Sequence, residues 1–173
     1  MKNIVYIATS LDGYIADKND GLDWLPSPDS ADFGFEAFID SIDALVMGKN
    51  TFQTVLAYGG EWFYSKPVFV VSSSLKEIPK HLEEKVFLIQ GTPTEITNLL
   101  RKEGFENLYI DGGLTVQNFL KEDVIDELII TTIPTLLGDG KPLFGKQEKQ
   151  LQFKCIESKV INKMVQNHFI KER

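Results

Sequence analysis

The chain has 173 residues, 43% of them apolar and 25% charged, which is the composition of one compact domain spanning residues 1–173. Its net charge of −7, with 18 scattered basic residues, argues against a nucleic-acid-binding or anionic-membrane surface. A single cysteine and two widely separated histidines exclude an internal disulfide, and we expect no metal site. The first residues lack the apolar core of a signal peptide, and no apolar run approaches the roughly 20 residues of a membrane span, so we expect a cytoplasmic protein.

The first half of the chain alternates short apolar runs with amphipathic segments. Asn3–Ala8 is apolar and β-branched, which predicts a buried strand. A helix is predicted over Asp32–Ile42, because Phe35, Phe38, Ile39 and Ile42 recur at i, i+3, i+4 and i+7. The following segments predict strands at Ala44–Met47, Val68–Val71 and Val86–Ile89 and a short helix at Asn50–Leu56.

The second half continues this alternation and ends in two adjacent strands. We expect helices at Thr94–Lys102, stopped by Gly104, and at Val116–Leu120, with strands at Leu108–Ile110 and Leu128–Thr132. The runs Phe153–Ile161 and Val165–Ile170 flank a short polar turn and predict an antiparallel hairpin. The fold class is therefore α/β, with a mostly parallel central sheet, helices on both faces and an antiparallel C-terminal end. Ligands of such sheets bind beyond the carboxyl ends of the strands.

Two turns at such ends share one layout. In Val46–Thr51 and Ile110–Thr115, a buried strand ends in glycine and a helix begins within a few residues. Glycine allows the backbone to approach a ligand closely, and the free N–H groups of the helix suit a phosphate. Neither turn is a complete Rossmann fingerprint or P-loop, so each is either a phosphate cradle or only a tight connection.

Four further sites have two readings each. Lys49 either contacts a phosphate or is a solvated surface lysine. The serines 72–74 either bind phosphate oxygens or cap the exit of the chain from the sheet. Asp32, among aromatic residues, is either an acid that anchors a ligand or a helix-capping residue. Trp24 either lines a pocket or covers the edge of the core.

Five motifs in register carry a resemblance to a known family. They are Ile7–Ala16 (IATSLDGYIA) with Trp24-Leu25, Val46–Thr51 (VMGKNT), Val70–Ser73 (VVSS), Ile110–Gly113 (IDGG) and Thr135–Phe144 (TLLGDGKPLF). The chain resembles the dihydrofolate reductase-like superfamily, and within it the branch related to the reductase domain of bacterial riboflavin biosynthesis. The resemblance implies a dihydrofolate reductase-like three-layer fold, an oxidoreductase activity and, because that branch is commonly dimeric, a homodimer.

The resemblance also implies NADPH as the cofactor and assigns residues to it. Ala8 would contact the nicotinamide through its backbone, with Ile15 lying over the ring. Gly48, Lys49 and Thr51 match the turn for the adenosine-side phosphates, and Ser72 and Ser73 match the pair near the 2′-phosphate. Ile110, Gly112, Gly113, Leu114 and Thr115 match the segment against the pyrophosphate. One cation of the family pattern is missing, since Gln90 stands in its place.

For the substrate, the resemblance puts Asp32 near the catalytic acid of dihydrofolate reductases, with Trp24, Phe35 and Ile15 as substrate contacts. The arginine-rich helix of riboflavin-pathway reductases is replaced here by residues 32–36 (DFGFE). We therefore expect hydride transfer to a pterin-, pyrimidine- or related heterocycle-like small molecule. The alternatives are a 5-amino-6-ribosylamino-uracil phosphate reductase and a non-catalytic binding protein on the same fold.

Overall fold

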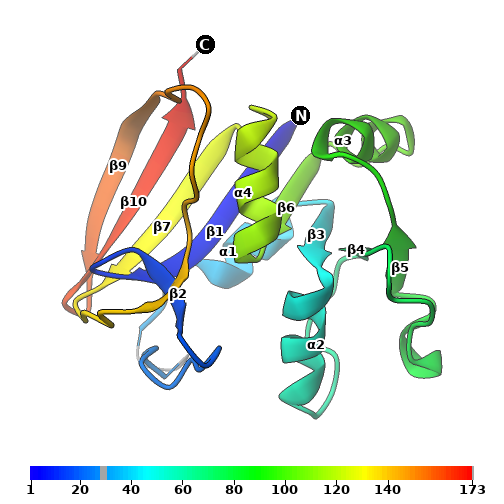
Figure 1. Cartoon of the computed structure of the whole chain (residues 1–173), viewed down its shortest axis with the longest axis horizontal. Coiled ribbons are helices and arrows are strands. Elements are labelled where there is room, and N and C mark those ends of the chain that lie inside the picture. The colour runs from blue at the N-terminus through cyan, green and yellow to red at the C-terminus, as the bar shows by residue number, and fades with distance from the viewer. Residues whose placement is uncertain (28–30, 173) are drawn as a thin grey trace.

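The computed structural model describes residues 1–27 and 31–172 and is built around a sheet of eight strands (Figure 1). Its strand order is β5-β4-β3-β6-β1-β7-β10-β9. All pairings from β5 to β7 are parallel, while β10 is antiparallel to both β7 and β9, as the sequence predicts. The bounds are β1 (Lys2–Ser10), β3 (Ala44–Gly48), β4 (Val68–Val71), β5 (Val86–Ile89), β6 (Asn107–Asp111), β7 (Glu127–Ile133), β9 (Phe153–Ile161) and β10 (Met164–Lys171).

Helices cover both faces of this sheet, which confirms the three-layer α/β prediction. They are α1 (Phe35–Ser41), α2 (Lys49–Ala57), α3 (Pro93–Lys102) and α4 (Gly113–Lys121). Alternate residues of β3 enter two separate cores: Val46 packs with the side chains of α3 and α4, whereas Leu45 and Met47 pack with those of α1 and α2. Figure 1 shows α4 in front of the sheet and α1 behind it.

Local signals fix several element ends. Thr92 and Glu95 form a capping box at the start of α3, and Gly104, at φ +93°, ends that helix. The N–H groups of Gly104 and Phe105 donate to carbonyls of the last helical turn at 3.1 and 3.0 Å, which is a Schellman motif. The C-terminal hairpin turns through Asn162 and Lys163, both with positive φ, as a two-residue type I′ turn requires.

The predicted helix Asp32–Ile42 begins later than its apolar pattern indicates. Asp32 precedes the helix, and its Oδ1 accepts a hydrogen bond from the Gly34 N–H at 2.7 Å. Gly34 has φ +79°, a left-handed conformation that does not continue an α-helix toward the N-terminus. The helix therefore runs only from Phe35 to Ser41, and the prediction that it contains Asp32 is wrong.

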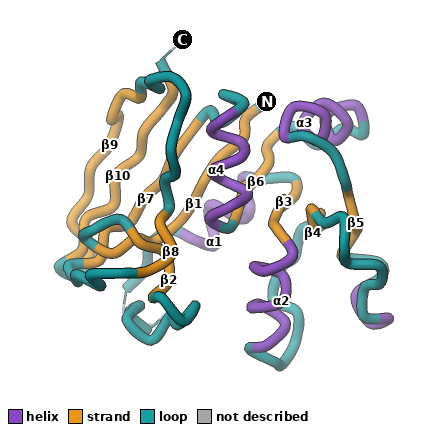
Figure 2. The backbone as a smooth tube through the Cα atoms, in the orientation of Figure 1, coloured by secondary structure: helices purple, strands orange, loops and turns teal. Residues whose placement is uncertain are grey.

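A small second sheet lies at one end of the large sheet and was not predicted. It pairs β2 (Tyr14–Asp17) with β8 (Gly140–Pro142). Asp12 joins the two segments, because its carboxylate accepts from the N–H groups of Leu137 and Gly138 at 3.2 and 2.8 Å. Figure 2 shows β2, β8 and α2 at the same end of the molecule, where the parallel strands end. A short 3-10 helix, η2 (Lys80–Leu82), precedes β5.

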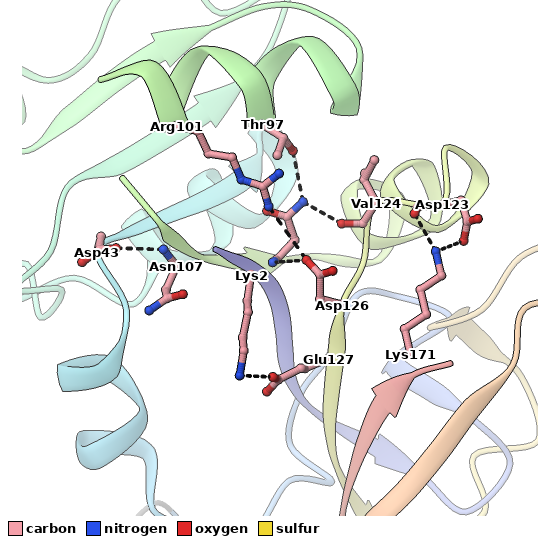
Figure 3. A network of polar contacts seen from close by, with 11 residues as sticks. Lys2, Asp43, Thr97, Arg101, Asn107, Asp123, Val124, Asp126, Glu127 and Lys171 are labelled. Atoms are coloured by element: carbon pink, nitrogen blue, oxygen red, sulfur yellow. Dashed lines mark hydrogen bonds and ion pairs between the residues drawn. The ribbon is translucent and has the colours of Figure 1, made fainter. Parts of the chain in front are cut away.

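The opposite end of the sheet is held by a polar network (Figure 3). Asn3, at the start of β1, is fully buried and donates from Nδ2 to the carbonyl of Val124 at 2.6 Å and to Thr97 Oγ1 at 3.1 Å. Asp126 accepts from the backbone N–H of Asn3 at 2.9 Å. These bonds join β1 to α3 and to the turn before β7, and so fix the register of the parallel strands. In the described part of the chain, no helix is long and apolar enough to cross a membrane.

Candidate functional site

A cavity of about 960 Å³ lies where β1, β3 and β6 end. Its size is in the range of small-molecule and cofactor sites. Of the residues predicted for the cofactor, nine line it: Ala8, Ile15, Gly48, Lys49, Thr51, Gly112, Gly113, Leu114 and Thr115. Ile110 is fully buried in the core under α3 and α4, on the strand that delivers Gly112. The carboxyl ends of parallel strands thus form the cavity, as the fold class predicts.

The two glycine turns pack against each other. They leave neighbouring strands, since Met47 of β3 is paired with Asp111 of β6. A Cβ on Gly112 would overlap Thr51 Oγ1, and one on Gly48 would come within 2.9 Å of Thr115 Oγ1. Each glycine precedes one helix and faces the third residue of the other helix. Gly112 also has φ +89°, so both space and backbone conformation require glycine there.

The two helices that begin at these turns have open N-termini. Among the described residues, no side chain caps α2 or α4, and neither first turn holds an acid. The free N–H groups and the positive ends of both helix dipoles therefore lie at one edge of the cavity. A Cβ on Gly113 would come within 2.9 Å of Ile15 Cδ1, which puts that predicted nicotinamide contact beside the second turn.

Lys49 lies next to the serine segment, which follows a different strand. Its Nζ donates to Ser74 Oγ at 3.0 Å. Ser72 is buried, and its Oγ accepts from the N–H groups of Ser74 and Leu75, so this hydroxyl caps the exit of the chain from β4. Ser73 is exposed, and neither Ser72 nor Ser73 is among the described residues that line the cavity. The serine that contacts the Lys49 ammonium is therefore Ser74.

The family model of the RibD C-terminal domain matches residues 2–166. This chain belongs to the RibD C-terminal domain family. It is 33% identical to the uncharacterized protein YwjB of Bacillus subtilis (strain 168), over 98% of both chains. It is also 51% identical, over the full length of both chains, to a protein of Shewanella sp. PV-4 that is named for riboflavin biosynthesis. The structures of the two proteins agree with a TM-score of 0.95.

The fold extends beyond the RibD family. Dihydrofolate reductase from Enterococcus faecalis, complexed with NADP(H), has a TM-score of 0.70 at 15% identity, over 99% of this chain and 97% of that one. This likeness shows the dihydrofolate reductase-like fold predicted from the sequence.

Of the residues predicted for catalysis and the substrate in this RibD domain, Ile15 lines the cavity, whereas the other three do not. Asp32 is exposed, and neither it, Trp24 nor Phe35 is among the described lining residues. Next to Asp32, the Tyr6 ring stacks on Phe38 with centroids 4.6 Å apart. The Tyr6 hydroxyl donates to the Phe33 carbonyl at 2.7 Å.

Gln166 of β10 completes this packing. Its Nε2 donates to the Phe33 carbonyl and to Thr131 Oγ1, both at 3.1 Å. Burial raises the pKa of Tyr6, which keeps its hydroxyl protonated as a donor. Side chains of the described residues therefore pack between α1 and the sheet at this place.

A different acid lines the cavity and was not singled out by the sequence reasoning. Asp111 is the last residue of β6, directly before the diglycine, and its Oδ1 accepts from the Gly112 N–H at 2.8 Å. Burial raises the pKa of Asp111 to about 6, and hydrogen bonds from Gly112 and Tyr109 offset part of that rise. A carboxyl with such a perturbed pKa in a cavity is a candidate proton donor. Its position before Gly112 was the one available signal.

The residues present fit a dinucleotide cofactor. Gly48, Gly112 and Gly113 leave a cradle that a Cβ would fill, and two helix N-termini with free N–H groups border it. The Lys49 ammonium is available at one side for a further phosphate. The chain has a net charge of −7, but the helix N-termini and Lys49 supply positive charge at this cavity, so the lining fits an anionic cofactor.

Proposed function

We propose that this RibD-type domain is an NADPH-dependent reductase of a small heterocyclic molecule, of pterin or pyrimidine type. The observation that carries the proposal is the pair of interlocked glycine turns, Gly48 against Thr115 and Gly112 against Thr51. The N–H groups of the first turns of α2 and α4 would bind the pyrophosphate of the cofactor. Lys49 and Ser74 would bind its 2′-phosphate. NADPH, when bound, supplies a hydride.

The chain's own residues would supply position and a proton. Ala8 and Ile15 line the cavity at the end of β1 and in β2, and would hold the nicotinamide end. Reduction of a C=N or C=C–C=O unit adds a proton as well as a hydride. Asp111 carries that proton at its carboxyl, because burial keeps a protonated fraction near neutral pH. We therefore assign to Asp111 the acid role that the sequence assigned to Asp32.

A second candidate follows from the family itself. Membership of the RibD C-terminal domain family supports, at the level of the family, reduction of a 5-amino-6-ribosylamino-uracil phosphate, whose phosphate would need a cation in the cavity. A protein that binds NADPH without turnover would instead be a binding protein on the same fold.

The test begins with NADPH and NADH, followed by nicotinamide fluorescence. The proposal predicts saturable binding with a preference for NADPH, and no effect at millimolar cofactor would contradict it. NADPH consumption with dihydrofolate, pterins and aminopyrimidinones then separates an enzyme from a binding protein. Asp111→Asn should lower turnover about 100-fold at unchanged NADPH affinity, whereas Asp32→Asn should leave turnover unchanged. The reverse result would return the acid role to Asp32.

A further inference from the structure

One side of the cavity is lined by aromatic side chains that the sequence analysis did not single out. Tyr58 is 62% exposed and Phe63 58% exposed, although both line a concave site. Tyr64 lines the cavity as well and is buried. We call these three residues the aromatic wall. Large aromatic side chains left exposed in a concave site are typical of surfaces that bind a ligand.

The aromatic wall is supported from behind by other rings. The Phe63 and Tyr64 rings lie 4.2 Å apart between centroids, and Trp62 meets Tyr64 edge-on at 5.4 Å. Trp62 in turn packs at 6.0 Å against Phe52, which is buried in α2. This stack joins Phe63 and Tyr64 to the core, and Tyr58 lies beside them as the C-cap residue of α2. Leu22 and Leu25, after β2, add apolar surface to the same cavity.

The charges of the cavity restrict what this wall would bind. The described lining residues carry two ammonium groups, Lys49 and Lys141, two carboxylates, Asp20 and Asp111, and no guanidinium. Lys141 lies 3.7 Å from the Asp20 carboxylate. Lys49 donates to Ser74 at the cofactor side.

Two carboxylates act on the wall: Asp23 adds to burial in raising the pKa of Tyr58, and Asp111 is part of the cavity lining. Its charge is felt at Tyr64, where it adds to burial in raising the pKa of that hydroxyl. A phosphate group beside Tyr64 would therefore meet the Asp111 carboxylate, which is unfavourable, because the proposed function gives Lys49 to the cofactor and Lys141 lies near Asp20. An amino or ring N–H group would instead meet a hydrogen-bond acceptor.

We infer that the aromatic wall and Asp111 form a subsite for a planar nitrogen heterocycle that carries no phosphate and is uncharged or cationic. The inference rests on the proposed function, since it presumes that the glycine turns hold the cofactor. The faces of Tyr58 and Phe63 stack on the ring, and the Asp111 carboxyl pairs with its N–H groups. The lack of a phosphate on this substrate would separate this chain from relatives named as reductases of a phosphoribosylamino-uracil.

Pterin, which is fluorescent and uncharged at pH 7, is the probe for the stacking claim. Titrated into the protein with and without saturating NADP⁺, it should bind, and Phe63→Ala and Tyr58→Ala should each weaken it about tenfold. Phe63→Tyr should restore the affinity. Phe87→Ala removes a phenylalanine of β5 that is 41% exposed and does not line the cavity, and this variant should bind pterin like the parent protein. Pterin binding that is unaffected by both wall variants, or absent altogether, overturns the subsite.

Pterin-6-carboxylate, the same ring with a negative substituent, tests the charge claim. It should bind at least tenfold more weakly than pterin, and Asp111→Asn should reduce that difference. Equal affinity of the two pterins, or an unchanged difference in the variant, overturns the assignment of Asp111. NADP⁺ affinity is recorded for every variant and should stay within twofold. A protein that binds pterin but not NADP⁺ would contradict the proposed function alone, whereas NADP⁺ binding without a wall-dependent pterin site contradicts this inference alone.

Discussion

Replacing Asp111 by asparagine should stabilise the protein at neutral pH, although the residue lines the candidate site. Burial raises the pKa of Asp111 from an ordinary value of 3.8 to about 6, so the folded state resists ionisation of this group. The folded protein binds more protons than the unfolded chain between about pH 4 and pH 6. Stability therefore falls across this window as the pH rises, and the loss persists above it.

The magnitude follows from the same values. The difference between 3.8 and about 6 corresponds to about 3 kcal/mol once the carboxylate is ionised. Asparagine removes that cost but retains only one acceptor oxygen for the Gly112 N–H and the Tyr109 hydroxyl, so the net gain should be about 1–2 kcal/mol.

Urea unfolding of both proteins between pH 4 and pH 8 measures this directly. The variant should be slightly less stable than the parent near pH 4, the two curves should cross near pH 5, and above about pH 6.5 they should run parallel with the variant more stable. Asp32→Asn, at an exposed carboxylate, is the matched control and should show no such divergence. A variant that is less stable than the parent at pH 8, or a pH-independent difference, would refute the reasoning. Functional sites often keep groups that lower the stability of the fold, and Asp111 would be such a group.

Three further predictions concern the backbone. Gly112→Ala should cost at least about 2 kcal/mol in unfolding free energy and abolish NADPH binding, because a Cβ there overlaps Thr51. Gly104→Ala, with similar positive φ but open space, should cost only about 1 kcal/mol and leave binding intact; equal losses for both would contradict the overlap. Lys163→Gly should raise the unfolding free energy by about 0.5–1 kcal/mol by relieving φ +69° in the hairpin turn, and an unchanged or lower melting temperature would contradict this. Asp12→Ala should increase amide hydrogen exchange in β2 and β8, and equal exchange of the two proteins at pH 7 would argue against this contact. Because the Ser10 hydrogen bond lowers the pKa of Asp12, the exchange rates of the parent should approach those of the variant only as the pH falls below 4.

The sequence predicts the central strands of the large sheet well because they are buried apolar runs, and it predicts the exposed strand β9 because a short polar turn separates it from β10. Val68–Val71, Val86–Ile89 and Phe153–Ile161 were predicted with the bounds that the structure has. By contrast, β2 and β8 are short and contain polar residues, and they pair mainly with each other across more than 120 residues. Such long-range pairing leaves no periodic pattern in either segment.

In the candidate site, too, the features with a local sequence signal could be predicted and those that depend on long-range packing could not. The glycine turns could be predicted because glycine at the end of a buried strand has a local reason. Asp111 and the aromatic wall could not be predicted, because the burial that raises the pKa of Asp111 and the cavity that gathers Tyr58, Phe63 and Tyr64 arise only when separate segments pack together. Asp32 was given the acid role because the resemblance puts it near the acid of dihydrofolate reductases and aromatic residues follow it in sequence, whereas in space its carboxylate accepts from the Gly34 N–H at the surface.

The central claim is that NADPH lies between the two glycine turns. Amide chemical shifts of the ¹⁵N-labelled protein, followed during an NADPH titration, test it most directly. We expect saturating shifts concentrated at the N–H groups of residues 48–51 and 112–115, with smaller shifts at Ala8 and Ile15. Shifts confined to other regions, or none at millimolar NADPH, would contradict the account.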